Sequence, residues 1–440
     1  MRYRYRIEER RERRIAFIKL IRRLAIFSLL LLVFYTIYLI SGGRPQLSEE
    51  SLKRLSLLPA RKTIELEFSK PVSSIRVVVE QEGKERPLLY EKLSAPVSRI
   101  NLDFDTRRLE LKDGEALLKI ELSSGLFSKR SYSLKTQIDT KPPALQILAY
   151  TPYVKQGGTG AIKVKAEEGA SVYLKFNEHT YTFYPVEKGY FLLLFPIRLD
   201  DSSASQVYVE ALDPAGNSAR QNLNLRIKEV KFKEDHIELT EDFINRAIYP
   251  LLGDEGRSLS PLDAFKRINE DWRRENIKKV EELGKRSEPK ALWEGAFLQL
   301  PNSKVLAGYG DIRHYYHKGQ LVSESRHMGY DFASVAQAPV PASNSGIVAF
   351  AGFLGIYGNT VIVDHGFGLM SLYGHLSEMT VKEGQYVKKG QTIGRTGATG
   401  LALGDHLHFG IIVQGYEVNP TEWLDPAWIE RVIMPVLKER

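Results

Sequence analysis

The sequence reads Gly404-Asp405-His406-Leu407-His408-Phe409-Gly410 near its C-terminus, and the surrounding sheet is expected to form around this stretch. Alternate side chains of a β-strand point to opposite faces, so His406 and His408 share one face while Leu407 and Phe409 point into a core. Two imidazoles on one face are candidate metal ligands or proton carriers, although an isolated His-x-His also occurs in ordinary strands.

Two further motifs add to this pair. They are His327-Met328-Gly329-Tyr330-Asp331 and Tyr373-Gly374-His375-Leu376, which bring the total to four histidines and a carboxylate in the last third of the chain. Cysteine is absent, so a zinc ion would have to be held by histidine and carboxylate alone.

The spacing within these motifs constrains their geometry. Extended residues four apart lie about 13 Å from each other, so His327 and Asp331 cannot share an ion on a straight strand. We expect the backbone to turn or bulge at Gly329. His406 and His408 lie about 7 Å apart along their strand, which suits one ring binding an ion and the other standing beside it.

From about Gly295 onward, short apolar runs alternate with glycines, which predicts a compact antiparallel sheet with tight turns. Over about 100 residues the motifs resemble those of the lysostaphin-type (LytM-like) zinc endopeptidases of bacterial cell walls. The matching segments are His327-x-x-x-Asp331, Pro339-Val340-x-Ala342, Gly346-x-Val348, Asp364-His365-Gly366, Tyr373-Gly374-His375-Leu376, Val387-Lys388-Lys389-Gly390-Gln391, Gly397-Ala398-Thr399-Gly400, His406-Leu407-His408-Phe409 and Asn419-Pro420.

The resemblance implies that His327, Asp331 and His408 hold one zinc ion per chain and that His375 and His406 stand beside the reacting water. It also implies a peptidoglycan peptide as substrate. Zinc lowers the pKa of its water to about 7. Since no His-Glu-x-x-His motif occurs, an imidazole must accept the proton, and the sequence does not assign the base and oxyanion-binding roles between the two rings.

Parts of the sequence are compatible with three other functions. Family members that have lost ligands activate cell-wall amidases, but this chain keeps all five residues of the implied site. The Val387–Gln391 segment is similar to a biotinyl or lipoyl carrier hairpin, yet a carrier leaves the histidines unexplained. An envelope scaffold built on the residues before 230 is the third alternative.

The N-terminus predicts membrane attachment. The first 23 residues contain ten arginine or lysine residues and three glutamates, a net +7 of the total +8, so the rest of the chain offers no broad basic surface for nucleic acid. Residues 24–43 are uncharged and apolar, which is about the length of a membrane-spanning helix. The basic flank orients residues 1–23 to the cytoplasm.

This pattern predicts a single-pass inner-membrane protein with its C-terminal domains in the periplasm or cell-wall space. A cleavable signal peptide is the alternative, but residues 41–43 are a poor cleavage site. Envelope proteins are further expected partners.

The middle of the chain predicts spacer modules and a connector, within a mainly β fold. Short β-branched runs at 61–140 and 144–228 have the spacing of two β-sandwiches, joined by Pro142-Pro143. The Pro-Pro opening and the Asp213–Asn217 turn resemble bacterial immunoglobulin-like modules.

Residues 229–295 predict a helical connector whose apolar stripe docks on the catalytic domain at 296–425 or, alternatively, on a partner helix. A helix is expected at 426–440. His314 and His317 are expected in a polar loop, and His365 in a turn with a structural role.

Overall fold

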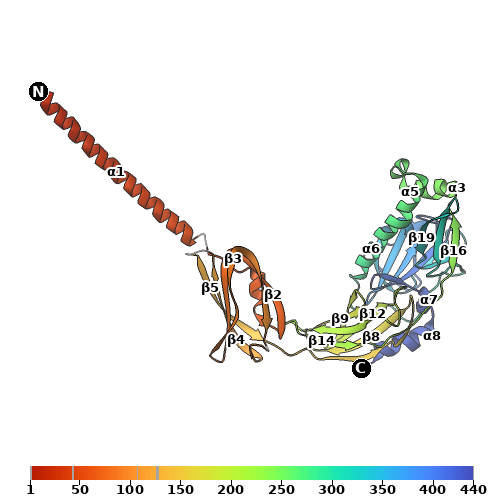
Figure 1. Ribbon diagram of the computed structural model, residues 1–440. Helices are drawn as coiled ribbons and strands as arrows, with labels where there is room; N and C mark the ends of the chain where they lie inside the picture. Colours follow the sequence, from red (N-terminus) through yellow and green to blue (C-terminus); the bar gives the residue numbers. More distant parts are fainter. Residues whose placement is uncertain (1, 42–43, 107, 125–127, 440) are drawn as a thin grey trace. The chain divides into compact units, whose positions relative to one another are not determined.

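The computed structural model describes residues 2–41, 44–106, 108–124 and 128–439 (Figure 1). Two compact units can be distinguished. One comprises Met1–Pro142 with Asp213–Asn217, and the other comprises Pro143–Leu212 with Ser218–Arg440. Most of the described elements are strands, so the fold is mainly β as predicted.

The N-terminal helix α1 (Arg2–Ser41) contains most of the membrane segment predicted for residues 24–43. The large apolar side chains between Leu24 and Tyr35 are exposed. Gly42, Gly43 and the side chains of residues 37–41 lie outside the described part of the chain. Within the described residues, no helix is both long and apolar enough to cross a membrane.

The first unit contains one five-stranded sheet and not the two-sheet sandwich predicted for residues 61–140. The order is β1 (Leu57–Leu58), β5 (Lys129–Ile138), β4 (Gly114–Ser123), β2 (Arg61–Gln81) and β3 (Lys84–Asp105). Strand length explains the difference, because two runs predicted as separate strands, 63–68 and 74–80, belong to the single 21-residue β2. Register shifts between Glu67 and Ser74 mark bulges, which bend a strand without ending it.

The second unit begins with two four-stranded sheets, the arrangement predicted for a sandwich at 144–228. One has the order β10 (His179–Thr182), β9 (Ser171–Phe176), β13 (Val207–Leu212) and β14 (Ser218–Asn222). The other has the order β11 (Tyr184–Glu187), β12 (Tyr190–Pro196), β8 (Thr159–Ala166) and β6 (Leu145–Tyr150). Leu174, Phe195 and Val209 belong to their common core.

The C-terminal part is built on an antiparallel sheet with β28 (Leu407–Val413) near its centre. The order is β17 (Lys304–Ala307), β20 (Tyr330–Ala333), β28, β24 (Leu369–Gly374), β23 (Asn359–Gly366), β22 (Gly346–Phe353) and β26 (Tyr386–Val387), and β29 (Tyr416–Val418) also pairs with β28. A smaller sheet has the order β21 (Pro339–Pro341), β27 (Thr392–Arg395) and β25 (Glu378–Met379).

Both faces of the large sheet are covered. On one face Tyr373 and Phe409 pack with Trp423 of α7 (Pro420–Leu424) and with Leu194 of the sandwich. On the other face Leu372 and Ile412 pack with Phe265 and Val280 of the connector. The apolar stripe of the connector therefore docks on the C-terminal sheet. This double burial holds the central strand, and His408 on it, in a fixed register.

The connector contains more than the predicted helices. Its helical part consists of α3 (Glu241–Phe243), η1 (Ile244–Ile248), α4 (Tyr249–Leu252), η2 (Glu255–Ser258), α5 (Pro261–Lys266), η3 (Arg267–Trp272) and α6 (Arg273–Gly284). Before these helices lies β16 (Glu234–Glu238), which pairs in parallel with β18 (Ile312–His317), and β18 pairs with β19 (Gln320–Arg326). The strand β16 was not predicted.

A helical segment also closes the chain, as predicted for residues 426–440. It consists of α8 (Pro426–Trp428), η5 (Ile429–Ile433) and α9 (Met434–Lys438). Residue 440 lies outside the described part.

Candidate metal centre and catalytic cleft

His327, Asp331 and His408 converge on one point. Oδ1 of Asp331 lies 3.0 Å from Nε2 of His327 and 3.0 Å from Nδ1 of His408, and the two ring nitrogens are 3.1 Å apart. All three side chains are largely buried, with Asp331 the most exposed at 13%. The three residues form a metal site.

Local backbone structure explains how residues four apart meet. His327 and Met328 lie between β19 and β20, and the chain bends at Gly329 before Asp331 enters β20, as the spacing predicted. In the sheet, Asp331 lies directly opposite His408. A Cβ atom at Gly329 would lie 2.7 Å from the ring of His408 and 2.6 Å from the carbonyl oxygen of Phe409, so only glycine fits at this bend.

The donor atoms suit a divalent cation. Nδ1 of His327 lies 2.7 Å from the carbonyl oxygen of Gly308, which only accepts, so Nδ1 carries the proton and Nε2 presents its lone pair to Asp331. A lone pair and a carboxylate oxygen at 3.0 Å repel each other unless a proton or a cation lies between them. Two imidazoles and one carboxylate are also the kind of three-ligand set that catalytic zinc uses.

Electrostatics favour the charged form of the carboxylate. Burial alone would raise the pKa of Asp331, but a proton shared between Oδ1 and the facing nitrogens of His327 and His408 supplies hydrogen bonds and positive charge that outweigh burial and hold the pKa well below its usual range. Burial lowers the pKa of His408 to about 4. The site therefore combines an anion with a neutral ring, which is the protonation state that metal binding requires.

His375 and His406 stand beside this cluster, and their rings are 4.7 Å apart between centroids. Nδ1 of His375 donates to the carbonyl oxygen of Thr399 at 2.7 Å, and Nδ1 of His406 donates to that of Gly404 at 2.8 Å. In the neutral form of each ring, the second nitrogen, Nε2, therefore carries no proton. Nε2 of His406 lies 3.6 Å from Oδ1 of Asp331. Burial, reinforced by the neighbouring His408 and His406, lowers the pKa of His375 to about 3.

The backbone at His375 is unusual. The residue follows the last residue of β24 and has a φ of 61°, in the left-handed region that favours glycine. Its N–H donates to the carbonyl oxygen of Tyr357 at 2.6 Å. Such a conformation persists only where surrounding bonds hold it, and here it directs the ring towards His406.

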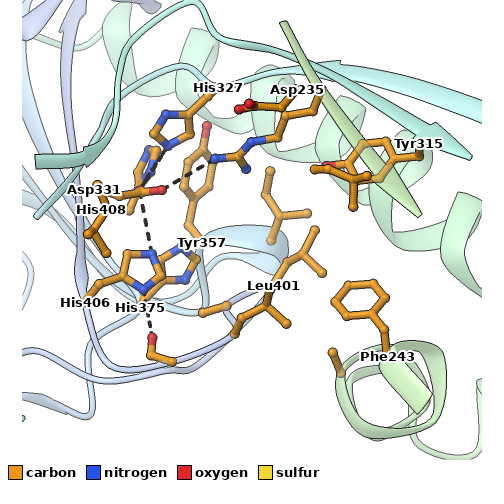
Figure 2. A pocket seen from close by; sticks show the side chains of 18 of the residues that line it. Asp235, Phe243, Tyr315, His327, Asp331, Tyr357, His375, Leu401, His406 and His408 are labelled. Atoms are coloured by element: carbon orange, nitrogen blue, oxygen red, sulfur yellow. Dashed lines mark hydrogen bonds and ion pairs between the residues drawn. The ribbon is translucent and has the colours of Figure 1, made fainter. Parts of the chain in front are cut away.

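The five side chains lie at one end of a cavity of about 670 Å³. Figure 2 shows His327, Asp331, His408, His375 and His406 gathered there, with Phe243 and Tyr315 at the far end. Because Phe243 belongs to the connector, residues before the catalytic sheet form part of the wall of the cleft.

Two site neighbours were not predicted from the sequence. Nη2 of Arg313, on β18, lies 3.5 Å from Oδ2 of Asp331. The ring of Tyr357 lies against His408 with centroids 5.2 Å apart, and its hydroxyl donates to Oε2 of the buried Glu417 at 2.7 Å. Desolvation raises the pKa of Glu417 to about 7.

The other histidines lie apart from the cluster. His365 has the predicted structural role, although it lies on β23 and not in a turn. It is fully buried between the carbonyl oxygen of Ser345 and the hydroxyl of Ser371, and burial lowers its pKa to about 4. His314 and His317, predicted in a loop, lie on β18.

Comparisons with known proteins converge on the same region. Residues 325–420 match the model of "Peptidase family M23", and all five residues of the implied site lie in this range. The DD-carboxypeptidase/endopeptidase Mpg of Neisseria meningitidis is 43% identical over 94 residues, which are 21% of this chain and 22% of that protein. The peptidoglycan DD-endopeptidase ShyA of Vibrio cholerae is 44% identical over 93 residues, with the same coverage of 21% and 22%.

Among solved structures, the catalytic domain of lysostaphin from Staphylococcus simulans is 34% identical. The match covers 30% of this chain and 98% of that domain, with a TM-score of 0.25. The chain thus spans about a fifth of the length of the two curated relatives named above.

Proposed function

Since residues 325–420 form a metallopeptidase domain of family M23, we propose that this protein is a zinc metalloendopeptidase that cuts peptide cross-links of peptidoglycan. The observation that carries the proposal is the convergence of Nε2 of His327, Oδ1 of Asp331 and Nδ1 of His408 on one point beside two further imidazoles. The names of the two bacterial relatives support the choice of a D,D-peptide bond.

A zinc ion held by the three ligands would polarise the peptide carbonyl and make a water molecule acidic near neutral pH. The protein then has to move one proton from that water to the leaving amine. His375 and His406 line the cavity beside the three ligands, and Nε2 of each ring is unprotonated when the ring is neutral, so either ring can accept the proton and later donate it. While protonated, the same ring can donate a hydrogen bond to the tetrahedral oxyanion.

Digestion of purified sacculi tests this proposal. The zinc-loaded protein should release fragments whose masses identify a cut at a D,D-peptide bond, with one new amino group for each cut. His408→Ala should abolish both zinc binding and release. A protein that binds no zinc and only stimulates an added amidase would establish the alternative role as an activator.

We also propose that residues 24–43 anchor the chain in the inner membrane, with the catalytic domain on the periplasmic or cell-wall side. The support is the uncharged apolar run behind a cluster of ten basic residues. Fractionation of cells that express the full chain tests it. The protein should remain in the membrane after a carbonate wash, and protease added to spheroplasts should remove the catalytic domain.

A further inference from the structure

The connector strand β16 has one unpaired edge. In the three-stranded sheet of order β16-β18-β19 it lies at the end, and its only strand partner among the described residues is β18. Edge strands carry a row of free backbone N–H and C=O groups, which can pair with another extended chain.

The hydrogen bonds to β18 define which groups are free. The carbonyl oxygen of Lys233 accepts from the N–H of Ile312, and the N–H of Leu239 donates to the carbonyl oxygen of Tyr316. Since the backbone groups of successive residues point to alternate sides of a strand, odd-numbered residues of β16 face β18. The N–H and C=O groups of His236 and Glu238 therefore face the open edge.

This edge borders the catalytic cavity. Asp235, His236, Ile237 and Glu238, four consecutive residues, line the same cavity as the metal site. Successive side chains of a strand point to opposite faces, so the side chains on one face of β16 would account for only two of these four residues. The ring of His236 stacks on that of Tyr316, with centroids 5.4 Å apart. The cavity therefore reaches both one face of β16 and its open edge.

The distance to the metal site suits a peptide of a few residues. Asp235 is the register partner of Arg313, whose guanidinium reaches Asp331, and neighbouring strands lie about 4.8 Å apart. An extended peptide that lies along β16 can therefore reach the metal site while its remaining residues follow the strand edge.

We propose that β16 binds the peptide substrate as an added β-strand, through the backbone N–H and C=O groups of His236 and Glu238. The inference rests on the proposed peptidase function and assigns a part of its substrate site outside residues 325–420. Main-chain pairing supplies affinity for an extended peptide with little demand on its side chains.

Proline substitution tests the proposal on the zinc-loaded full chain. His236→Pro removes an outward N–H and leaves the ladder to β18 intact, and edge strands tolerate proline. For a cross-linked stem peptide, we expect the KM to rise about tenfold, with kcat within twofold and zinc content unchanged. The matched control is Glu234→Pro, which lies on the same side of the strand but outside the cavity and should leave the KM unchanged.

A second measurement avoids any folding defect of the variants. The wild-type protein is given substrates in which single amides remote from the cut bond are replaced by esters. The KM should rise only for substrates in which the ester replaces an amide that faces β16, which is every second amide of an extended peptide. Equal KM values for both proline variants, no effect of any ester, or a wild-type dimer that His236→Pro dissociates would overturn the proposal. If the wild type cuts no peptide at all, the proposed function fails and this inference falls with it.

Discussion

Arg313 holds the outer oxygen of a metal ligand: its Nη2 lies 3.5 Å from Oδ2 of Asp331, while Oδ1 of the same carboxylate faces His327 and His408. The two oxygens thus have different partners. This arrangement leaves Oδ1 free for a metal ion and fixes the plane of the carboxylate.

Arg313→Gln should therefore weaken zinc binding. Loss of a partner that orients a ligand typically reduces metal affinity about 10- to 100-fold, and we expect a change in this range in competition with a chelator. Arg313→Lys should recover part of the affinity, because a lysine keeps the charge but not the planar fork. Unchanged zinc affinity in Arg313→Gln would show that the contact does not support the ligand.

His375→Ala and His406→Ala should keep zinc and lose turnover. Neither ring belongs to the cluster of three ligands, and loss of a proton carrier typically costs about 10² to 10⁴ in rate. Zinc content by mass spectrometry of the native protein, together with kcat on a cross-linked peptide, separates the two effects. Loss of zinc equal to that in His408→Ala would overturn this division of roles.

Gly329→Ala should disturb the metal site through packing alone. The added methyl group would lie 2.6 Å from the carbonyl oxygen of Phe409 and 2.7 Å from the ring of His408, so one of them must move. We expect about 1–3 kcal/mol lower stability and weaker zinc binding. Gly404→Ala is the control, since no atom lies within 4 Å of its added Cβ. Equal thermal midpoints and zinc affinities for the two variants would contradict the packing argument.

The stability of the catalytic domain should fall in acid. Burial lowers the pKa of His365 to about 4, whereas in the unfolded chain it is about 6.5. As the pH falls, the unfolded chain therefore takes up this proton at a higher pH than the folded protein does. The contribution of His365 to the free energy of unfolding is thus complete above pH 6.5 and is lost as the pH falls towards 4. It amounts to about 3 kcal/mol. Urea unfolding of His365→Gln should show a smaller decrease between pH 7 and 4.5 than the wild type, and parallel decreases would refute the assignment.

The metal ligands could be predicted because the resemblance to the lysostaphin-type endopeptidases rests on motifs that are local in the sequence. Each ligand lies in a short motif, and the bend at Gly329 follows from the distance between residues four apart on a strand. The docking of the connector was also predictable, because Phe265 and Val280 belong to a helical apolar stripe that packs on the sheet.

The features that were missed depend on contacts distant in sequence. Arg313 reaches Asp331 only because β18 lies beside the cleft. The strand β16 contains Glu-Asp-His-Ile-Glu, in which Ile237 is the only apolar residue, so it shows no apolar alternation. In the first unit, the bulged part of β2 contains Pro71 and serines and therefore looked like a turn between two strands.

The dependence of activity on zinc tests the central claim most directly. The metal-free protein is titrated with zinc while the cleavage of a defined cross-linked stem peptide is measured. We predict that the rate rises linearly and levels off at one zinc per chain, and that His327→Ala shows no rise. A rate that does not depend on zinc, or a fully zinc-loaded protein that cuts no peptide bond, would contradict the account.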